Sequence, residues 1–116
     1  LVSDGLGRIN ELVGAHVIEV RALPGEYALN QNYPNPFNPD TQIPYQLPES
    51  GEIFLAIYNL LGQQVAVLIQ GAHEAGFHRV VWDGKDLFGR SLASGIYFVR
   101  MTADGFSGVR KMLLLK

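Results

Sequence analysis

Proline is confined to the first part of the chain, and short apolar runs separated by glycine-containing turns follow it. Pro48 is the last of six prolines. Because proline cannot donate a backbone hydrogen bond to a sheet ladder, its absence after Pro48 leaves that region free to form paired strands. The runs are short, rich in β-branched and aromatic residues, and bounded by turn residues, a pattern that predicts strands rather than helices.

Alternation of apolar and polar residues supports this interpretation. His78, Val80 and Trp82 would share one face of a strand, and the residues between them would share the other. Several runs are apolar on both faces, as expected of a sandwich whose outer face is partly covered. The predicted strands are Gln42–Leu47, Glu52–Asn59, Gln63–Gln70, Phe77–Asp83, Ile96–Ala103 and Gly108–Leu115. Their number and spacing predict an all-β sandwich.

Turn residues indicate how these strands connect. Leu60-Leu61-Gly62 predicts a tight hairpin between the second and third strands, since Gly62 accepts a positive φ. Asp104-Gly105 predicts a hairpin between the last two strands. Gly71–Gly76 is expected to link the third and fourth strands.

Residues 1–26 differ from the rest and are predicted to form an extended arm ahead of a domain at 27–116. Ala15–Leu23 alternates as a strand does, with Val17, Ile18, Val20 and Leu23 as its apolar residues, but has no hairpin partner nearby in the sequence. It would pair within its own sandwich, with an upstream domain, or with an identical subunit that accepts it as a donor strand. Because the chain begins at Leu1, we expect a processed chain or a piece of a longer one.

Composition excludes several functional classes. The 116 residues suffice for one ordinary domain, and without cysteine there is no disulfide, thiolate metal site or cysteine nucleophile. Nucleic acid is not an expected partner, because the formal net charge is −2 and lysine and arginine form no cluster. No glycine-rich phosphate loop or nucleophile elbow occurs, so we expect neither an enzyme nor a small-molecule substrate nor a cofactor.

Two sets of polar residues are of a type that can bind metal ions. Asp83 and Asp86 share a glycine-containing loop where calcium is conceivable, but a turn held by their own side chains is the stronger interpretation, since two carboxylates are few. His16, His73 and His78 lack the spacing of metal ligands and are expected at surface or edge positions. No metal site is therefore predicted.

Aromatic residues recur along the predicted strands. They could form a sugar-binding platform, although packing between sheets is the more frequent role at strand spacing. The residues concerned are Tyr45, Phe54, Tyr58, Phe77, Trp82, Tyr97 and Phe98.

From Tyr27 onward the sequence resembles a known family through several motifs in order. Tyr27–Pro39 (YALNQNYPNPFNP), Ile57–Ala66 (IYNLLGQQVA), Trp82–Arg90 (WDGKDLFGR), Ser94–Tyr97 (SGIY) and Lys111–Lys116 (KMLLLK) carry the resemblance. Together they resemble the type A C-terminal sorting domain of proteins exported by the bacterial type IX secretion system. The Trp-Asp-Gly segment is also similar to the immunoglobulin-like domain of flagellar hook-capping proteins.

This resemblance implies an immunoglobulin-like antiparallel sandwich of about seven strands that serves as an export address. The expected partner is the outer-membrane secretion machinery, and the expected location is the outer cell surface or the extracellular space, reached through the periplasm. Such a domain is commonly removed after export. The alternative function is that of a structural subunit in an extracellular filament or surface layer, assembled by donation of residues 15–23.

Two segments are the candidate recognition elements. The first is Pro34, Asn35, Pro36, Phe37, Asn38 and Pro39, where proline restricts the backbone into a rigid exposed loop. The more frequent role of such a segment is a stiff entry loop in which Phe37 fills the end of the core, and both roles can hold at once. The second is Lys111, Met112, Leu113, Leu114, Leu115 and Lys116, which could be captured by strand addition or could simply be the last core strand.

Overall fold

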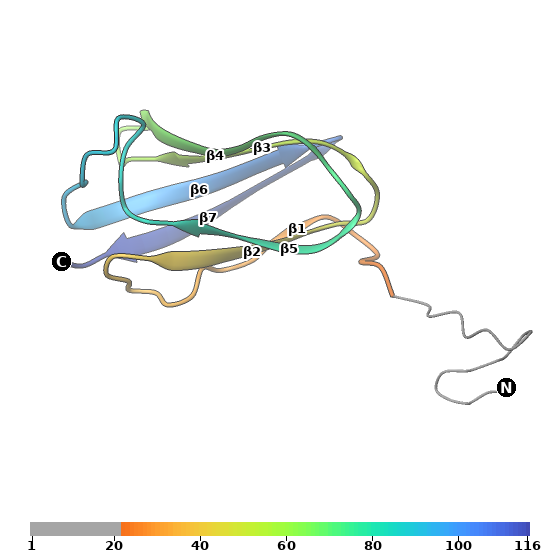
Figure 1. Ribbon diagram of the computed structural model, residues 1–116, viewed down its shortest axis with the longest axis horizontal. Coiled ribbons are helices and arrows are strands. Elements are labelled where there is room, and N and C mark those ends of the chain that lie inside the picture. The colour runs from red at the N-terminus through yellow and green to blue at the C-terminus, as the bar shows by residue number, and fades with distance from the viewer. Residues whose placement is uncertain (1–21) are drawn as a thin grey trace, which may run out of the picture.

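The computed structural model describes residues 22–116, which fold into two antiparallel sheets packed face to face (Figure 1). The strands are β1 (Ala28–Leu29), β2 (Thr41–Leu47), β3 (Gly51–Tyr58), β4 (Gln64–His73), β5 (Gly76–Trp82), β6 (Gly95–Ala103) and β7 (Phe106–Leu114). The predicted all-β class and the immunoglobulin-like sandwich are confirmed. Residues 22–116 contain no helix that could cross a membrane.

One sheet has the strand order β1-β2-β5 and the other β4-β3-β6-β7. Both predicted hairpins are present, because β3 pairs with β4 and β6 pairs with β7. The link between β4 and β5 is shorter than predicted: β4 extends to His73, with Gly71 paired opposite Ile53. The prediction interpreted Gly71 as a turn residue, but a glycine without a side chain also fits inside a strand. The short link carries the chain from one sheet to the other.

The core lies between the two sheets and follows the predicted alternation. On β5, Trp82 is buried whereas Phe77 and Val81 are 67% and 54% exposed on the outer face. On β6, Tyr97, Val99 and Met101 point inward. Outer apolar side chains such as Phe77 and Val81 therefore remain in contact with solvent within the part of the chain that the structure describes.

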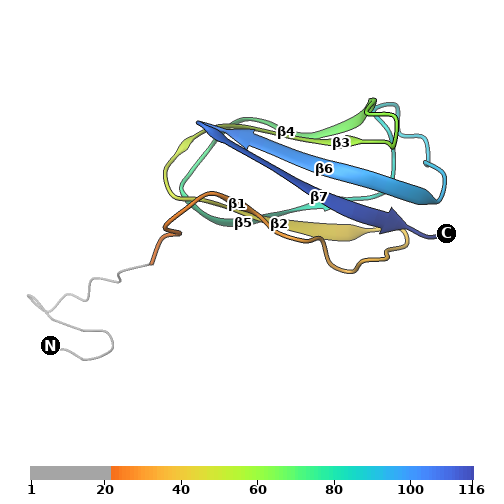
Figure 2. The same cartoon turned by 180° about the vertical axis from the view of Figure 1, so that it is seen from behind.

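The strand connections define two ends of the sandwich. At the proximal end, where the described chain begins, lie the short links before β3, β5 and β7. At the distal end lie the loop before β2, the turn at 59–63, the loop at 83–94 and the C-terminus. Figure 1 and the reverse view in Figure 2 show the C-terminus at the end opposite the chain's entry.

The predicted donor strand falls mostly outside the described residues. Val17, Ile18 and Val20 are not among residues 22–116. Leu23 is described, is 58% exposed and belongs to no strand, so the strand predicted for residues 15–23 does not extend to its last residue.

Candidate recognition surface at the distal end

The loop Tyr33–Asp40, here called the entry loop, is closed at its base by backbone and side-chain hydrogen bonds. Tyr33 and Gln42 each donate a backbone N–H to the other's carbonyl at 2.8 Å. Beneath them the buried Asn32 amide donates to Thr41 Oγ1 at 2.9 Å and to the Pro34 carbonyl at 3.1 Å. The Thr41 hydroxyl donates to the same carbonyl at 2.8 Å. The loop is therefore anchored by a small buried polar network rather than by local turn geometry.

Sequence reasoning missed Asn32 and Thr41, although both are almost fully buried. Burying polar groups is unfavourable unless they are hydrogen-bonded, so their presence in the core indicates a specific structural need. Asn32 stands directly before Tyr33-Pro34. An amide beside prolines, which leave carbonyls without the usual partners, could have signalled such a network.

The entry loop also pairs with the last strand, although the two segments are far apart in the sequence. Phe37 forms a parallel bridge with Leu114. The Phe37 N–H donates to the Leu113 carbonyl and the Leu115 N–H donates to the Phe37 carbonyl, both at 3.0 Å. The Leu113 N–H donates to Asn35 Oδ1 at 2.9 Å. The two predicted recognition elements thus form one continuous surface, and the entry loop covers this part of the β7 edge.

An aromatic cluster lies beneath this surface. Phe37 is 2% exposed and its ring centroid lies 5.5 Å from that of Trp82. Trp82 contacts Tyr97 edge-on at the same centroid distance. Each polar ring end is hydrogen-bonded: Trp82 Nε1 donates to the Lys85 carbonyl at 3.0 Å and the Tyr97 hydroxyl to the Ala93 carbonyl at 2.8 Å. Burial raises the pKa of Tyr97 above its ordinary value.

Gly84, in the Trp-Asp-Gly motif, allows these segments to approach one another. Its φ of +75° lies in the left-handed region, and a Cβ there would lie 3.3 Å from the Pro39 carbonyl oxygen. The same Cβ would contact the Leu114 side chain at 3.6 Å. Glycine at this position therefore lets the entry loop, the 83–94 loop and the last strand meet.

The turn predicted for Asp83 and Asp86 is present. Asp83 Oδ1 accepts the Lys85 N–H at 3.1 Å, and Asp86 Oδ1 accepts the N–H groups of Phe88 and Arg90 at 2.9 Å. Asp86 Oδ2 accepts Arg90 Nε at 3.1 Å. The backbone N–H of Arg90 is the largest influence that lowers the pKa of Asp86.

These contacts explain the loop without an ion. Both oxygens of Asp86 already accept hydrogen bonds from the protein. Residues 22–116 contain no group of three or more histidine, aspartate or glutamate side chains placed to hold a metal.

The predicted recognition residues divide by burial. Phe37, Met112 and Leu114 are core residues, and Leu113 is half-buried. Exposed at the surface are Pro34, Asn35, Pro36, Asn38, Pro39, Lys111, Leu115 and Lys116. A groove of about 250 Å³ runs between the two elements, lined by Asn35, Pro36, Ile96, Lys111, Met112 and Leu113. An exposed, rigid and partly apolar surface of this kind suits contact with another macromolecule.

The remaining candidates lie elsewhere. His73 and His78 lie in consecutive strands of different sheets and come together at the proximal end with ring centroids 5.6 Å apart. Their sequence spacing did not predict this proximity. Tyr45 stacks on His78 and its hydroxyl lies 3.4 Å from His73 Nδ1. His16 is not among the described residues. The aromatic residues are divided between the core and both outer faces, so they do not form one platform.

Comparison with known proteins supports the fold assignment. A search of curated proteins found no significant match. Among solved structures, the chain is similar to dimeric latent PorU from Porphyromonas gingivalis, with a TM-score of 0.61 and 16% identity over 87% of this chain. The match spans about a tenth of that longer protein (10%) and, at this identity, shows a shared fold alone.

The family comparison is more specific. The family model of the FlgD Ig-like domain matches residues 38–106, which is more than half of the chain. The matched segment runs from the end of the entry loop to the first residue of β7. Most of the candidate recognition surface therefore lies in segments that flank it. The chain belongs to the FlgD Ig-like domain family.

Proposed function

We propose that this domain is a non-catalytic sorting and surface-attachment domain, recognised by outer-membrane machinery of type IX secretion. One observation carries the proposal: backbone hydrogen bonds join the entry loop to the segment Lys111–Lys116, so the two form one surface. These are the two motifs that the resemblance to sorting domains singles out as its beginning and end. A receptor that binds this surface would contact both motifs at once.

The position of this surface supports the proposal. It lies at the distal end, opposite the point where the described chain enters the domain (Figure 2). A cargo attached ahead of the domain would leave the distal end accessible to a receptor. The exported protein would then reside at the outer cell surface or in the extracellular space.

The mechanism is recognition of a folded surface. Three segments distant in sequence meet at Phe37, Gly84 and Leu114, so the surface exists only when the sandwich is folded. The machinery would therefore bind the folded domain and not the unfolded chain. The part of the chain described in the structure needs no catalytic group for this role.

Export of a reporter tests the proposal. The full chain would be fused behind a periplasmic reporter in a host with the secretion system, and reporter outside the cell would be measured. Deleting Lys111–Lys116 is a poor variant because Met112 and Leu114 are fully buried and the domain would unfold. Exposed substitutions avoid this problem: Pro36→Ser with Asn38→Ser in the loop, and Leu115→Ser with Lys116→Gln at the terminus.

We expect both pairs of substitutions to reduce export several-fold. The free energy of unfolding, measured by urea denaturation, should stay unchanged. The matched control changes exposed proximal residues, Glu49→Gln with Glu74→Gln, and should be exported normally. Normal export of both distal pairs, or an equal loss in the proximal control, would overturn the proposal.

A further inference from the structure

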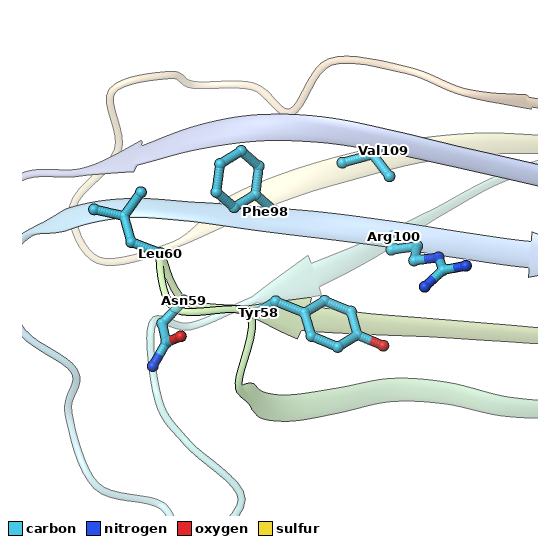
Figure 3. A pocket seen from close by; sticks show the side chains of 7 residues that line it. Tyr58, Asn59, Leu60, Phe98, Arg100 and Val109 are labelled. Carbon is cyan, nitrogen blue, oxygen red and sulfur yellow. The ribbon is translucent and has the colours of Figure 1, made fainter.

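The outer face of the four-stranded sheet carries an apolar band with two cations. On β6 and β7, Phe98 pairs opposite Lys111 and Arg100 pairs opposite Val109. Each cation therefore has an apolar residue beside it on the neighbouring strand. Tyr58 of β3 extends the row beside Phe98. Figure 3 shows Tyr58, Phe98, Arg100 and Val109 on these neighbouring strands, with Leu60 at the turn. Val109 and Leu60 are 54% and 65% exposed.

This band is hollowed rather than flat. A groove of about 290 Å³ is lined by Tyr58, Asn59, Leu60, Gly62, Phe98, Arg100 and Val109. A second groove, which shares Asn59 and Leu60 with the first, continues to Ile96. Ile96 also lines the groove beside Lys111 and Leu113. Three adjoining grooves on one face are sites into which the side chains of a partner could insert.

The charges on the face select the occupant. Arg100 and Lys111 line the grooves and no aspartate or glutamate does. Within residues 22–116 neither cation forms a salt bridge; the ion pair found there joins Arg90 and Asp86. Neighbouring cations without a counter-charge favour an anionic partner.

Two other occupants fit this face less well. A second copy packed face to face would bring together two faces whose grooves carry cations and no carboxylate, and like charges across an interface are repulsive. A lipid surface favours protruding apolar side chains. Although Leu60 and Val109 are exposed, the aromatic rings of Tyr58 and Phe98 are half-buried at the sides of a groove, where a separate side chain can insert. An extended segment presents every second side chain to one face, which matches the spacing of positions along β6.

We propose that the outer face of the β3-β6-β7 strands binds an extended segment of another protein that carries apolar side chains with a carboxylate between them. The apolar side chains enter the grooves beside Phe98 and Leu60. The carboxylate lies between Arg100 and Lys111. The site shares Lys111 and one groove with the recognition surface described above. It needs no secretion machinery, so the peptide experiment below tests it independently of export.

A synthetic peptide probes the site. It has leucine, glutamate and leucine at alternate positions, separated by serine, and a second peptide replaces each glutamate by lysine. Titration into the isotope-labelled full chain, followed by amide NMR shifts, should show binding of the glutamate peptide with shifts concentrated at Phe98, Arg100 and Val109. The lysine peptide should bind at least about tenfold more weakly, since exposed charges act mainly through such complementarity.

A charge-reversed variant sharpens the test. Arg100→Glu with Lys111→Glu changes exposed side chains and should invert the preference between the two peptides. The matched control is Arg79→Glu, on the outer face of β5 between the exposed Phe77 and Val81, which should leave the preference unchanged.

Four outcomes would overturn the proposal. They are equal binding of both peptides, shifts confined to the β5 face, no shift up to the solubility limit of the peptide, and binding to phosphatidylglycerol vesicles in preference to the glutamate peptide. The last would assign the face to a lipid surface.

Discussion

The two ends of the sandwich are built differently. The proximal end is closed by short links between strands, and its exposed charges include the carboxylates of Glu26, Glu49, Glu74 and Asp104. The distal end joins segments far apart in sequence: the entry loop, the 83–94 loop and the last strand meet at Gly84 and Leu114. The proximal end thus combines local links with a few distant contacts, such as the stacking of Tyr27 on Phe106. At the distal end, backbone hydrogen bonds join the entry loop to the last strand, so that surface depends on the whole chain being folded.

This contrast suggests why a recognition surface would lie at the distal end. Short turns reform locally and carry little information about the rest of the domain. A surface made of distant segments disappears when any one of them detaches. Substitutions at the distal end should accordingly lower the stability of the whole domain more than matched substitutions at the proximal end.

The largest difference is expected for aromatic residues. Phe37→Ala should lower the free energy of unfolding by about 3–5 kcal/mol, because a nearly fully buried ring beside Trp82 is lost. Phe106→Ala, at the proximal end, removes a half-buried ring stacked on Tyr27 and should cost about 1–2 kcal/mol. Urea denaturation of both variants measures the two losses in the free energy of unfolding. Equal losses would mean that the two ends contribute alike.

Glycine substitutions give the next largest difference. Gly84 and Gly105 have φ values of +75° and +72°, so alanine at either is strained by about 1–2 kcal/mol. Only at Gly84 would the added Cβ also meet the Pro39 carbonyl and Leu114, whereas nothing lies within 4 Å at Gly105. Gly84→Ala should therefore be the more destabilising, by about 1 kcal/mol in thermal unfolding. A reversed order would show that the entry loop yields freely.

A smaller effect is expected where the entry loop holds the last strand. Asn35→Ala removes the acceptor of the Leu113 N–H and should cost about 0.5–1.5 kcal/mol. Amide hydrogen exchange at Leu113 should accelerate accordingly. Asn38→Ala, at an exposed position in the same loop, is the control. If both variants exchange at the same rate as the parent protein, the Asn35 contact does not hold the strand.

Much of the sandwich followed from the sequence because its signals are local. Alternation placed Trp82 and Phe77 on opposite faces of one strand, as the structure has them, and Gly62 and Gly105 marked hairpins that the structure contains. Which of the two faces is the inner one was not predicted. The β4–β5 link was the exception, since Gly71 lies in a strand. Local pattern distinguishes a turn glycine from a strand glycine poorly, because both simply lack a side chain.

The distal surface was only partly predictable. Its two motifs were identified separately, but pairing of Phe37 with Leu114 depends on tertiary packing that no local pattern encodes. The buried network of Asn32 and Thr41 was missed because polar residues in a loop normally indicate exposure. The proximity of His73 and His78 follows from the chain crossing between sheets, which spacing along the sequence does not reveal.

The smallest expected effect concerns pH and the 83–94 loop. The pKa of Asp86 is lowered in the folded protein, first by the Arg90 N–H and then by its other hydrogen-bond donors. A carboxyl whose folded pKa lies below the unfolded value of 3.8 stabilises the fold at neutral pH. This contribution is lost as the pH falls below that value and the carboxylate takes up a proton.

Asp86→Asn keeps an oxygen acceptor but removes the charge, so it should unfold at a lower temperature than the parent protein at pH 7. The gap should close between about pH 4 and pH 2 as Asp86 itself becomes neutral. Because its ionic partner Arg90 is exposed and solvent screens the pair, the whole effect should be smaller than that of Asn35→Ala. A gap that stays constant from pH 7 to pH 2 would mean that the amide disturbs the loop geometry, and that the distal loop depends on the shape of this side chain rather than on its charge.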